Sequence, residues 1–170
     1  MKFSIVVPTY NEENDIAGTL DALVALDYPD KETVVVDDST DSTPTIVGRY
    51  AAQDVRLVRP ARREGRCGAR NLGIMEATGD IVVILNADVR PRKDFLRRLA
   101  PHYEQDGDYV LVNAEVANND DLFARYVDAM AAVDESGDPS WMEWTEGFSC
   151  RRDLAIRAGM FPTGFAVPIC

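Results

Sequence analysis

The stretch that most constrains the fold of this chain is residues 79–88, GDIVVILNAD. Five apolar residues occupy positions 81–85 and are followed by Asn86-Ala87-Asp88. A short, unbroken apolar run between turn residues is typical of a strand buried on both faces, as in a parallel sheet. Asp88 then follows the carboxyl end of that strand, where open α/β sheets bind ligands. One segment therefore predicts both a central strand and a candidate ligand-binding residue.

The rest of the first hundred residues alternates between strand and helix patterns. Runs of β-branched and aromatic residues predict strands at residues 2–8, 33–36, 55–58 and 81–85. Amphipathic spacing predicts helices at residues 12–26, 43–52, 69–78 and 92–104. This order is typical of a three-layer α/β/α fold with a mainly parallel, Rossmann-like central sheet. Weaker patterns predict strands at residues 109–116 and 148–151 and helices at residues 122–133 and 154–158.

Length and hydrophobicity indicate a single domain. The chain has 170 residues, of which 46% are hydrophobic, enough for one α/β core. The sequence has no signal-peptide pattern and no apolar stretch long enough to span a bilayer. Its three cysteines are widely spaced and form neither a disulfide framework nor a zinc pattern. These features predict a cytoplasmic domain.

The charge balance argues against nucleic acid as a partner. The net charge is −11, whereas nucleic-acid-binding surfaces are basic. The chain has 19 Asp against 10 Glu, and 15 Arg against 3 Lys. Abundant Asp with scarce Lys favours a halophilic source, as a hypothesis. Unfolding at high salt, with folding kept at low salt, would contradict it.

Polar residues follow three of the predicted strands and therefore predict a shared site. They are Thr9-Tyr10-Asn11-Glu12, Asp37-Asp38 and Asn86-Ala87-Asp88. The ends of parallel strands meet at one edge of a sheet, so we expect these groups to line one crevice. Residues 59–70 hold five arginines, whose forked guanidinium groups suit phosphate oxygens. Taken singly, each feature has a simpler explanation as a turn, a helix cap or a solvated surface. Their coincidence at successive strand ends favours an anionic ligand bound together with a divalent cation.

Four segments in this order and spacing resemble the family 2 inverting glycosyltransferases: SIVVPTYNEE, VVVDDSTDST, GRCGARNLGI and GDIVVILNAD. The resemblance implies the GT-A fold and a nucleotide-diphospho-sugar donor, UDP- or GDP-linked. It implies that residues 1–105 form a donor-binding half and residues 106–170 an acceptor-side half. The acceptor would be a glycan or a lipid.

The resemblance also implies roles for particular residues. Pro8, Thr9, Tyr10 and Glu12 match the positions that hold the nucleoside, with Tyr10 near the base. Asp37 and Asp38 match the carboxylates that recognise the base or ribose, and Arg66 and Arg70 match basic positions near the diphosphate. The run Asn86-Ala87-Asp88 matches the family's Asp-X-Asp element, which binds ribose and a metal ion.

Two departures from the family pattern affect the chemistry. Asn86 replaces the first Asp, and an amide is a weaker, neutral metal ligand, so Asp88 would be the main side-chain ligand for Mg²⁺ or Mn²⁺. Family members also carry a catalytic base in a later acidic pair, which the C-terminal residues here lack. We therefore expect an acceptor-side half that is incomplete at its C-terminus, with the base beyond Cys170. Glu146 is the candidate within the chain, although a surface-loop role is the simpler interpretation.

Two other functions stay open at this point. A non-catalytic nucleotide-sugar-binding domain would explain the missing acidic pair. A sugar-nucleotide pyrophosphorylase has a related fold, but it normally has a Gly-rich loop after the first strand, where this chain has Pro8-Thr9-Tyr10. Residues 123–133 predict a helix that could lie against the inner face of a membrane or cover the acceptor site, although core packing is the simpler interpretation. Trp141 and Trp144 are candidates for stacking on a sugar or for core packing.

Overall fold

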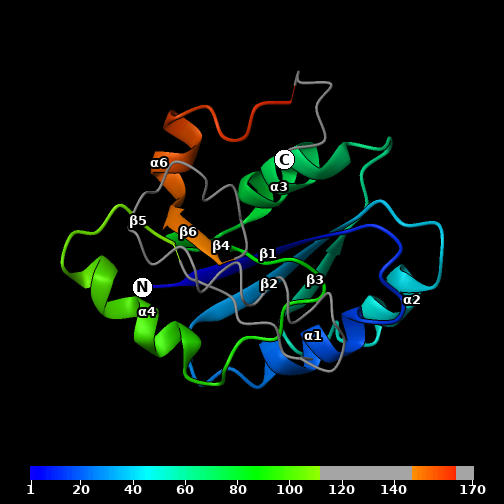
Figure 1. Ribbon diagram of the computed structural model, residues 1–170, viewed down its shortest axis with the longest axis horizontal. Helices are drawn as coiled ribbons and strands as arrows, with labels where there is room; N and C mark the ends of the chain where they lie inside the picture. Colours follow the sequence, from blue (N-terminus) through cyan, green and yellow to red (C-terminus); the bar gives the residue numbers. More distant parts are fainter. Residues whose placement is uncertain (112–146, 164–170) are drawn as a thin grey trace, which may run out of the picture.

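A computed structural model of the chain describes residues 1–111 and 147–163 (Figure 1). Its sheet has the strand order β3-β2-β1-β4-β6-β5. Strands β1 (Phe3–Thr9), β2 (Lys31–Asp37), β3 (Val55–Val58) and β4 (Ile81–Ile84) are parallel. Strand β6 (Phe148–Arg151) runs antiparallel to β4, and β5 (Tyr109–Val110) antiparallel to β6. The sheet is therefore mainly parallel, as predicted.

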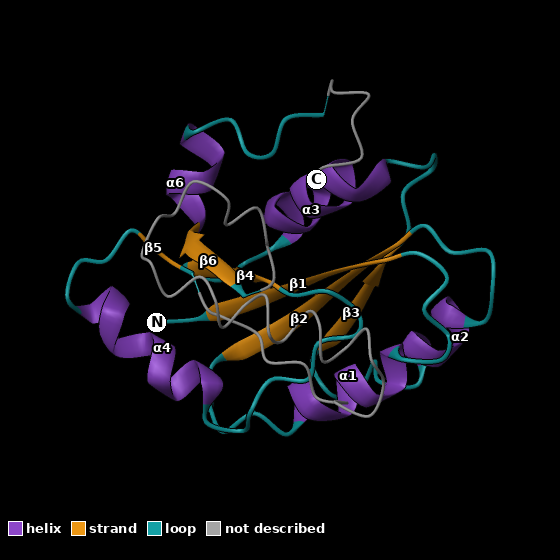
Figure 2. Ribbon diagram, viewed as in Figure 1, coloured by secondary structure: helices purple, strands orange, loops and turns teal. Residues whose placement is uncertain are grey.

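Helices cover both faces of this sheet, which confirms the three-layer α/β/α architecture (Figure 2). On one face lie α1 (Ile16–Val24), α2 (Thr43–Gly48) and α4 (Phe95–Glu104). On the other lie α3 (Gly65–Glu76) and α6 (Arg152–Arg157). Among the described residues no helix is long and apolar enough to cross a membrane.

The two faces are filled by alternating residues of the same strands. Phe3, Ile5 and Val7 of β1 belong to the core cluster under α1, α2 and α4. Val6, between them in sequence, belongs to the cluster that includes Ile74 of α3. Successive side chains of a strand point to opposite faces, so a continuous apolar run serves both layers. This is why the unbroken runs in the sequence predicted the central strands correctly.

The helix boundaries differ from the predicted ones. Helix α1 begins at Ile16 rather than at residue 12, so no acidic residue lies in its first turn. The preceding residues instead form a turn, in which Asn11 has a φ of 58°. Helix α2 ends at Gly48, and α4 begins at Phe95, three residues later than predicted.

Helix α3 is displaced toward the N-terminus relative to its prediction. It begins at Gly65 and ends at Glu76, with the extended residue Ala77 as its C-cap. Gly79, which follows this helix, allows two segments to approach closely. A Cβ at Gly79 would lie 2.8 Å from the carbonyl oxygen of Lys2, and the Gly79 amide donates to Ser4 Oγ at 2.8 Å.

Several predictions fall outside the described residues. These are the predicted helix at 122–133, the candidate base Glu146, the two tryptophans, the C-terminal residues after 163 and most of the predicted strand at 109–116. The described part of that strand is β5. The predicted strand at residues 148–151 is confirmed as β6.

Candidate functional site at the carboxyl edge of the sheet

The three polar strand ends lie at one edge of the sheet, as predicted. Strands β1 and β2 are paired to their ends, where Thr9 lies opposite Asp37. The amide of Asp38 donates to the carbonyl oxygen of Thr9 at 3.1 Å, which extends this pairing by one residue. Strand β4 lies on the other side of β1, with Ile84 opposite Val6, so residues 86–88 emerge beside residues 10–12. The side chains predicted to converge therefore come from three neighbouring strands.

Asp37 is buried below this edge. Its side chain is fully buried, and Oδ1 accepts hydrogen bonds from Thr9 Oγ1 at 2.9 Å and from the Ser39 amide at 3.3 Å. Oδ2 lies 3.3 Å from Arg59 Nε, an ion-pair distance without hydrogen-bond geometry. Arg59 also donates to the carbonyl oxygen of Ser39 at 2.7 Å. Asp37 thus ties the ends of β1 and β2 together, and of the two neighbouring aspartates only Asp38 is partly exposed.

The loop after β1 is fixed to the loop after β2 by side-chain hydrogen bonds. The backbone amide of Asn11 donates to Ser39 Oγ at 2.7 Å, and the side-chain oxygen Oδ1 of Asn11 accepts from the backbone amide of Thr40 at 3.0 Å. The Glu12 amide donates to Thr43 Oγ1 at 2.9 Å. Short polar side chains that bond to backbone groups stabilise tight turns. These hydrogen bonds were not predicted, although Asn and Ser directly after strands are their usual signal.

Two carboxylates, Glu12 and Asp88, interact electrostatically where β1 and β4 end. The pKa of Glu12 is raised, first by burial and next by repulsion from Asp88, with smaller effects of Asp15 and Asp41. The residue that precedes Asp88 is held in place, because Thr19 Oγ1 donates to the Ala87 carbonyl oxygen. Asp88 itself is exposed. A divalent cation between Glu12 and Asp88 would remove their repulsion.

The metal-binding capacity of this edge is limited. The described residues include no group of three or more His, Cys, Asp or Glu side chains placed to hold a metal ion. Mg²⁺ commonly needs only one or two carboxylates when substrate phosphates supply further oxygens. The donor set around Asp88 fits an ion of that kind, held jointly with a phosphorylated ligand.

The arginines of α3 divide into an exposed and a buried one. Asp38 Oδ2 accepts a hydrogen bond from the amide of Glu64, the N-cap of α3, at 3.0 Å, which fixes the start of the helix next to β2. Arg66 is exposed in the first turn, whereas Arg70 is only 1% exposed. The guanidinium carbon of Arg70 lies 5.5 Å from the centre of the Phe161 ring. Burial of Arg70 was not predicted.

Tyr10 and Arg63 form a second arginine–aromatic contact. Tyr10 follows β1 at the carboxyl edge of the sheet and is 44% exposed. The guanidinium carbon of Arg63 lies 4.0 Å from the centre of its ring. Arg63 belongs to the arginine cluster of residues 59–70, but its contact with Tyr10 was not predicted, since the two residues are distant in sequence.

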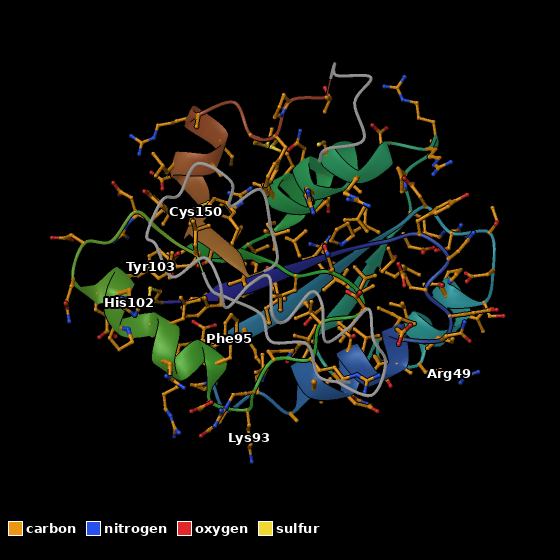
Figure 3. All side chains as sticks on the ribbon, viewed as in Figure 1. Arg49, Lys93, Phe95, His102, Tyr103 and Cys150 are labelled. Atoms are coloured by element: carbon orange, nitrogen blue, oxygen red, sulfur yellow. The ribbon has the colours of Figure 1, made fainter. Side chains whose placement is uncertain are left out.

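The single histidine and the buried cysteine of β6 lie away from the carboxyl edge. Figure 3 shows His102 on α4, and its neighbour Tyr103 packs edge-on against Phe3, at the amino end of β1. Cys150 is a free, buried thiol of β6. Cys67 takes part in a disulfide bond, which the sequence analysis did not predict.

A hollow of about 650 Å³ occurs at the opposite edge of the sheet. It lies at the amino ends of β1, β2 and β3, where Lys2, Lys31 and Val55 contribute to its lining. Ligands of open α/β sheets bind at the carboxyl ends of the strands. We therefore expect no donor in the hollow, which serves as the control region when a bound ligand is located on the protein.

Comparison with known proteins agrees with this arrangement. The family model "Glycosyl transferase family 2" matches residues 4–167. Succinoglycan biosynthesis protein ExoO of Rhizobium meliloti is 35% identical over 119 residues, which are 69% of this chain and 34% of ExoO.

Two solved structures share the fold. Mannosyltransferase PcManGT of Pyrobaculum calidifontis, solved with GDP-Man and Mn²⁺, has a TM-score of 0.72 and 31% identity over 96% of this chain and 48% of PcManGT. TarS 1–349 of S. aureus has a TM-score of 0.78 at 24% identity, over 99% of this chain and 52% of that one. The chain thus spans a third to a half of these relatives.

The family match extends over nearly the whole chain and includes all three strand ends of the carboxyl edge. The structural matches assign the α/β/α fold to the GT-A glycosyltransferases. This chain belongs to glycosyl transferase family 2.

Proposed function

We propose that the chain binds a nucleotide-diphospho-sugar at the carboxyl edge of its sheet and transfers the sugar to an acceptor hydroxyl with inversion. The observation that carries the proposal is the convergence of Tyr10 and Glu12, Asp38, and Asp88 from three adjacent parallel strands. In support, PcManGT was solved with GDP-Man and Mn²⁺, and TarS with UDP-GlcNAc. We infer that residues 1–105 bind the donor and that residues 106–170 face the acceptor.

The nucleoside half of the donor is assigned to the ends of β1 and β2. The segment Pro8–Thr9–Tyr10 forms one wall, and the exposed ring of Tyr10 offers a stacking face to the base. Asp38 is partly exposed and is the carboxylate that would contact base or ribose. Asp37 is buried and would support this contact by fixing both strand ends. The family resemblance implies the nucleoside role, and burial separates the contacting Asp38 from the supporting Asp37.

The diphosphate is assigned to the space between Asp88 and α3. Asp88, with Glu12 beside it and Asn86 and Ala87 in the same turn, would hold Mg²⁺ or Mn²⁺ together with phosphate oxygens. Such an ion stabilises the charge of a departing diphosphate. Arg66 is exposed and would contact the phosphates, while Arg70 adds a buried positive charge in the same helix. Acids alone would repel the donor, so the cation and the arginines are both required.

The acceptor hydroxyl needs a base that takes its proton as it attacks the anomeric carbon. Glu146 is the candidate base within this chain, and the alternative is a carboxylate beyond Cys170. The acceptor would be a glycan or a lipid. Association with the inner face of a membrane is a further prediction, which co-sedimentation with anionic vesicles tests.

A second candidate function is nucleotide-sugar binding without catalysis. Within residues 147–163 the single carboxylate is Asp153, and it pairs with Arg157 at 3.2 Å on the surface of α6. Residues 147–163 therefore contain no acidic pair. Binding of a nucleotide-sugar without release of nucleoside diphosphate would favour this function. Turnover that is lost in Glu146→Gln would favour the transferase with its base in this chain.

The role of Asp88 can be tested by calorimetric titration of GDP and UDP, each with and without Mn²⁺. We expect Mn²⁺ to strengthen binding of one nucleotide to the unmodified chain, and Asp88→Asn to remove that gain. The matched control is Asp80→Asn, at the opposite end of the same strand, where Asp80 accepts a hydrogen bond from the Lys2 amide at 2.8 Å. Equal Mn²⁺ dependence in both variants would refute the role of Asp88.

A further inference from the structure

Asn71 of α3 holds a residue that is 90 positions away in the sequence. Its Nδ2 donates to the carbonyl oxygen of Phe161 at 2.7 Å, and its Oδ1 accepts from the Phe161 amide at 2.9 Å. A carboxamide offers a donor and an acceptor side by side, as a neighbouring strand would. Both backbone groups of Phe161 are therefore satisfied by one side chain.

The chain reaches this contact through a tight reversal after α6. Gly159 has a φ of 86° and Met160 a φ of 60°, and the Met160 amide donates to the Ala155 carbonyl oxygen at 3.0 Å. Left-handed backbone at a residue other than glycine is uncommon and persists where surrounding contacts hold it. The paired hydrogen bonds to Asn71 are such contacts.

The side chain that Asn71 places is the aromatic cover of a buried arginine. The Phe161 ring lies 5.5 Å from the guanidinium carbon of Arg70, and it packs edge-on against Phe148 at 6.2 Å. Attraction between a guanidinium and an aromatic face increases when water is excluded, and Arg70 is 1% exposed. Phe161 is therefore held by two adjacent residues of α3. Asn71 binds its backbone, and Arg70 contacts its ring.

We propose that Asn71 is a positioning residue that, by holding Phe161 over Arg70, keeps the Arg70 charge in place for the donor diphosphate. The inference rests on the proposed function, in which α3 provides positive charge to the donor. A charge in a site from which water is excluded acts more strongly on a phosphate than a charge in water does. Release of Phe161 would admit water and let the guanidinium turn away. The protein would then bind the phosphates of the donor more weakly, whereas its affinity for the nucleoside would not change.

The test compares the affinities of nucleoside diphosphate and nucleoside monophosphate, measured by calorimetry with Mn²⁺ for GDP against GMP and for UDP against UMP. The preference for the diphosphate isolates the phosphate contact from the nucleoside contact. We expect Asn71→Ala and Phe161→Leu each to reduce this preference by about tenfold, with monophosphate affinity nearly unchanged. Phe161→Tyr keeps the aromatic face and should retain the preference.

A control variant separates positioning from general support of α3. Arg152 of α6 also donates two hydrogen bonds to α3, to the carbonyl oxygens of Ile74 and Met75, both at 2.9 Å. Arg152→Ala should lower the melting temperature without changing the diphosphate preference. If it lowers the preference as much as Asn71→Ala does, Asn71 is merely structural and the inference is wrong.

Two further outcomes separate failure of this inference from failure of the proposed function. An unmodified chain without any preference for the diphosphate would overturn the proposed function itself. A clear preference in that chain that persists in Asn71→Ala and Phe161→Leu would overturn the inference and leave the function intact. If Asn71→Ala does not fold, Phe161→Leu against Phe161→Tyr decides the question, because both keep the backbone hydrogen bonds.

Discussion

Replacement of Gly73 by alanine tests how closely α3 approaches the sheet. A Cβ at Gly73 would lie 2.2 Å from Val6 Cγ1 and 3.3 Å from Val36 Cγ2. Val6 and Val36 are fully buried in the central strands β1 and β2. The nearest pair would be about 1.8 Å inside the usual contact distance of about 4 Å. Neither a rotamer change in a packed core nor a small shift removes an overlap of that size.

The expected loss of stability follows from two opposing effects. Overpacking a core typically costs about 1–3 kcal/mol, whereas alanine favours a helix over glycine by about 1 kcal/mol. The difference is about 0–2 kcal/mol. Because the approach of 2.2 Å is severe, we expect Gly73→Ala to lower the free energy of unfolding by the upper half of that range, about 1–2 kcal/mol. For a chain of this size, that loss lowers the melting temperature by about 2–8 °C. Urea titration should show a lower midpoint with an unchanged slope.

Gly48 provides the matched control for this substitution. It is the last residue of α2, and a Cβ there would have nothing within 4 Å. Gly48→Ala should therefore leave stability unchanged or raise it by up to about 1 kcal/mol. The reasoning is refuted if Gly73→Ala is as stable as Gly48→Ala, because the close approach of α3 to β1 would then not exist.

Two further predictions concern groups away from the site. Burial by itself raises the pKa of Glu32, but hydrogen bonds from Ser4 and Thr78 outweigh it and lower the pKa below its usual 4.5. The stability that Glu32 adds is therefore complete above pH 4.5 and lost as the pH falls through the lower folded-state pKa. Glu32→Gln should flatten the acid limb of a plot of melting temperature against pH, and an unchanged limb would contradict this. Burial also raises the pKa of the Cys150 thiol to about 11, so it should resist thiol reagents at pH 8 until urea unfolds the chain. Rapid labelling of Cys150 in the native chain, read by mass spectrometry, would refute that burial.

The strands could be predicted from the sequence because each one carries its own signal. Residues 55–58 and 148–151 were predicted with their observed bounds, and the runs at 33–36 and 81–85 fall within one to two residues of β2 and β4. Buried strands are short apolar runs between turn residues, so their position in the sequence is marked locally. Helix ends were less predictable, because caps depend on distant partners. The segment before α1, for example, is held in a turn by hydrogen bonds to residues 39–43.

The candidate site was predictable as a set of strand ends but not as a set of contacts. Parallel pairing alone brings Tyr10, Asp38 and Asp88 to one edge. Burial of Asp37 and Arg70, by contrast, depends on packing that no local pattern reveals. The bonds between Asn71 and Phe161 join residues 90 positions apart. Contacts of this kind depend on the complete fold, so sequence spacing gives no sign of them.

Hydrogen–deuterium exchange with and without nucleotide and Mn²⁺ shows which edge of the sheet binds the donor. We predict slower exchange at residues 9–12, 38–40, 64–66 and 86–88, at the carboxyl ends of β1, β2 and β4 and at the start of α3. The residues that line the hollow at the opposite edge, such as Lys31 and Val55, should exchange at unchanged rates. Protection confined to that hollow, with the carboxyl edge unaffected, would contradict the account.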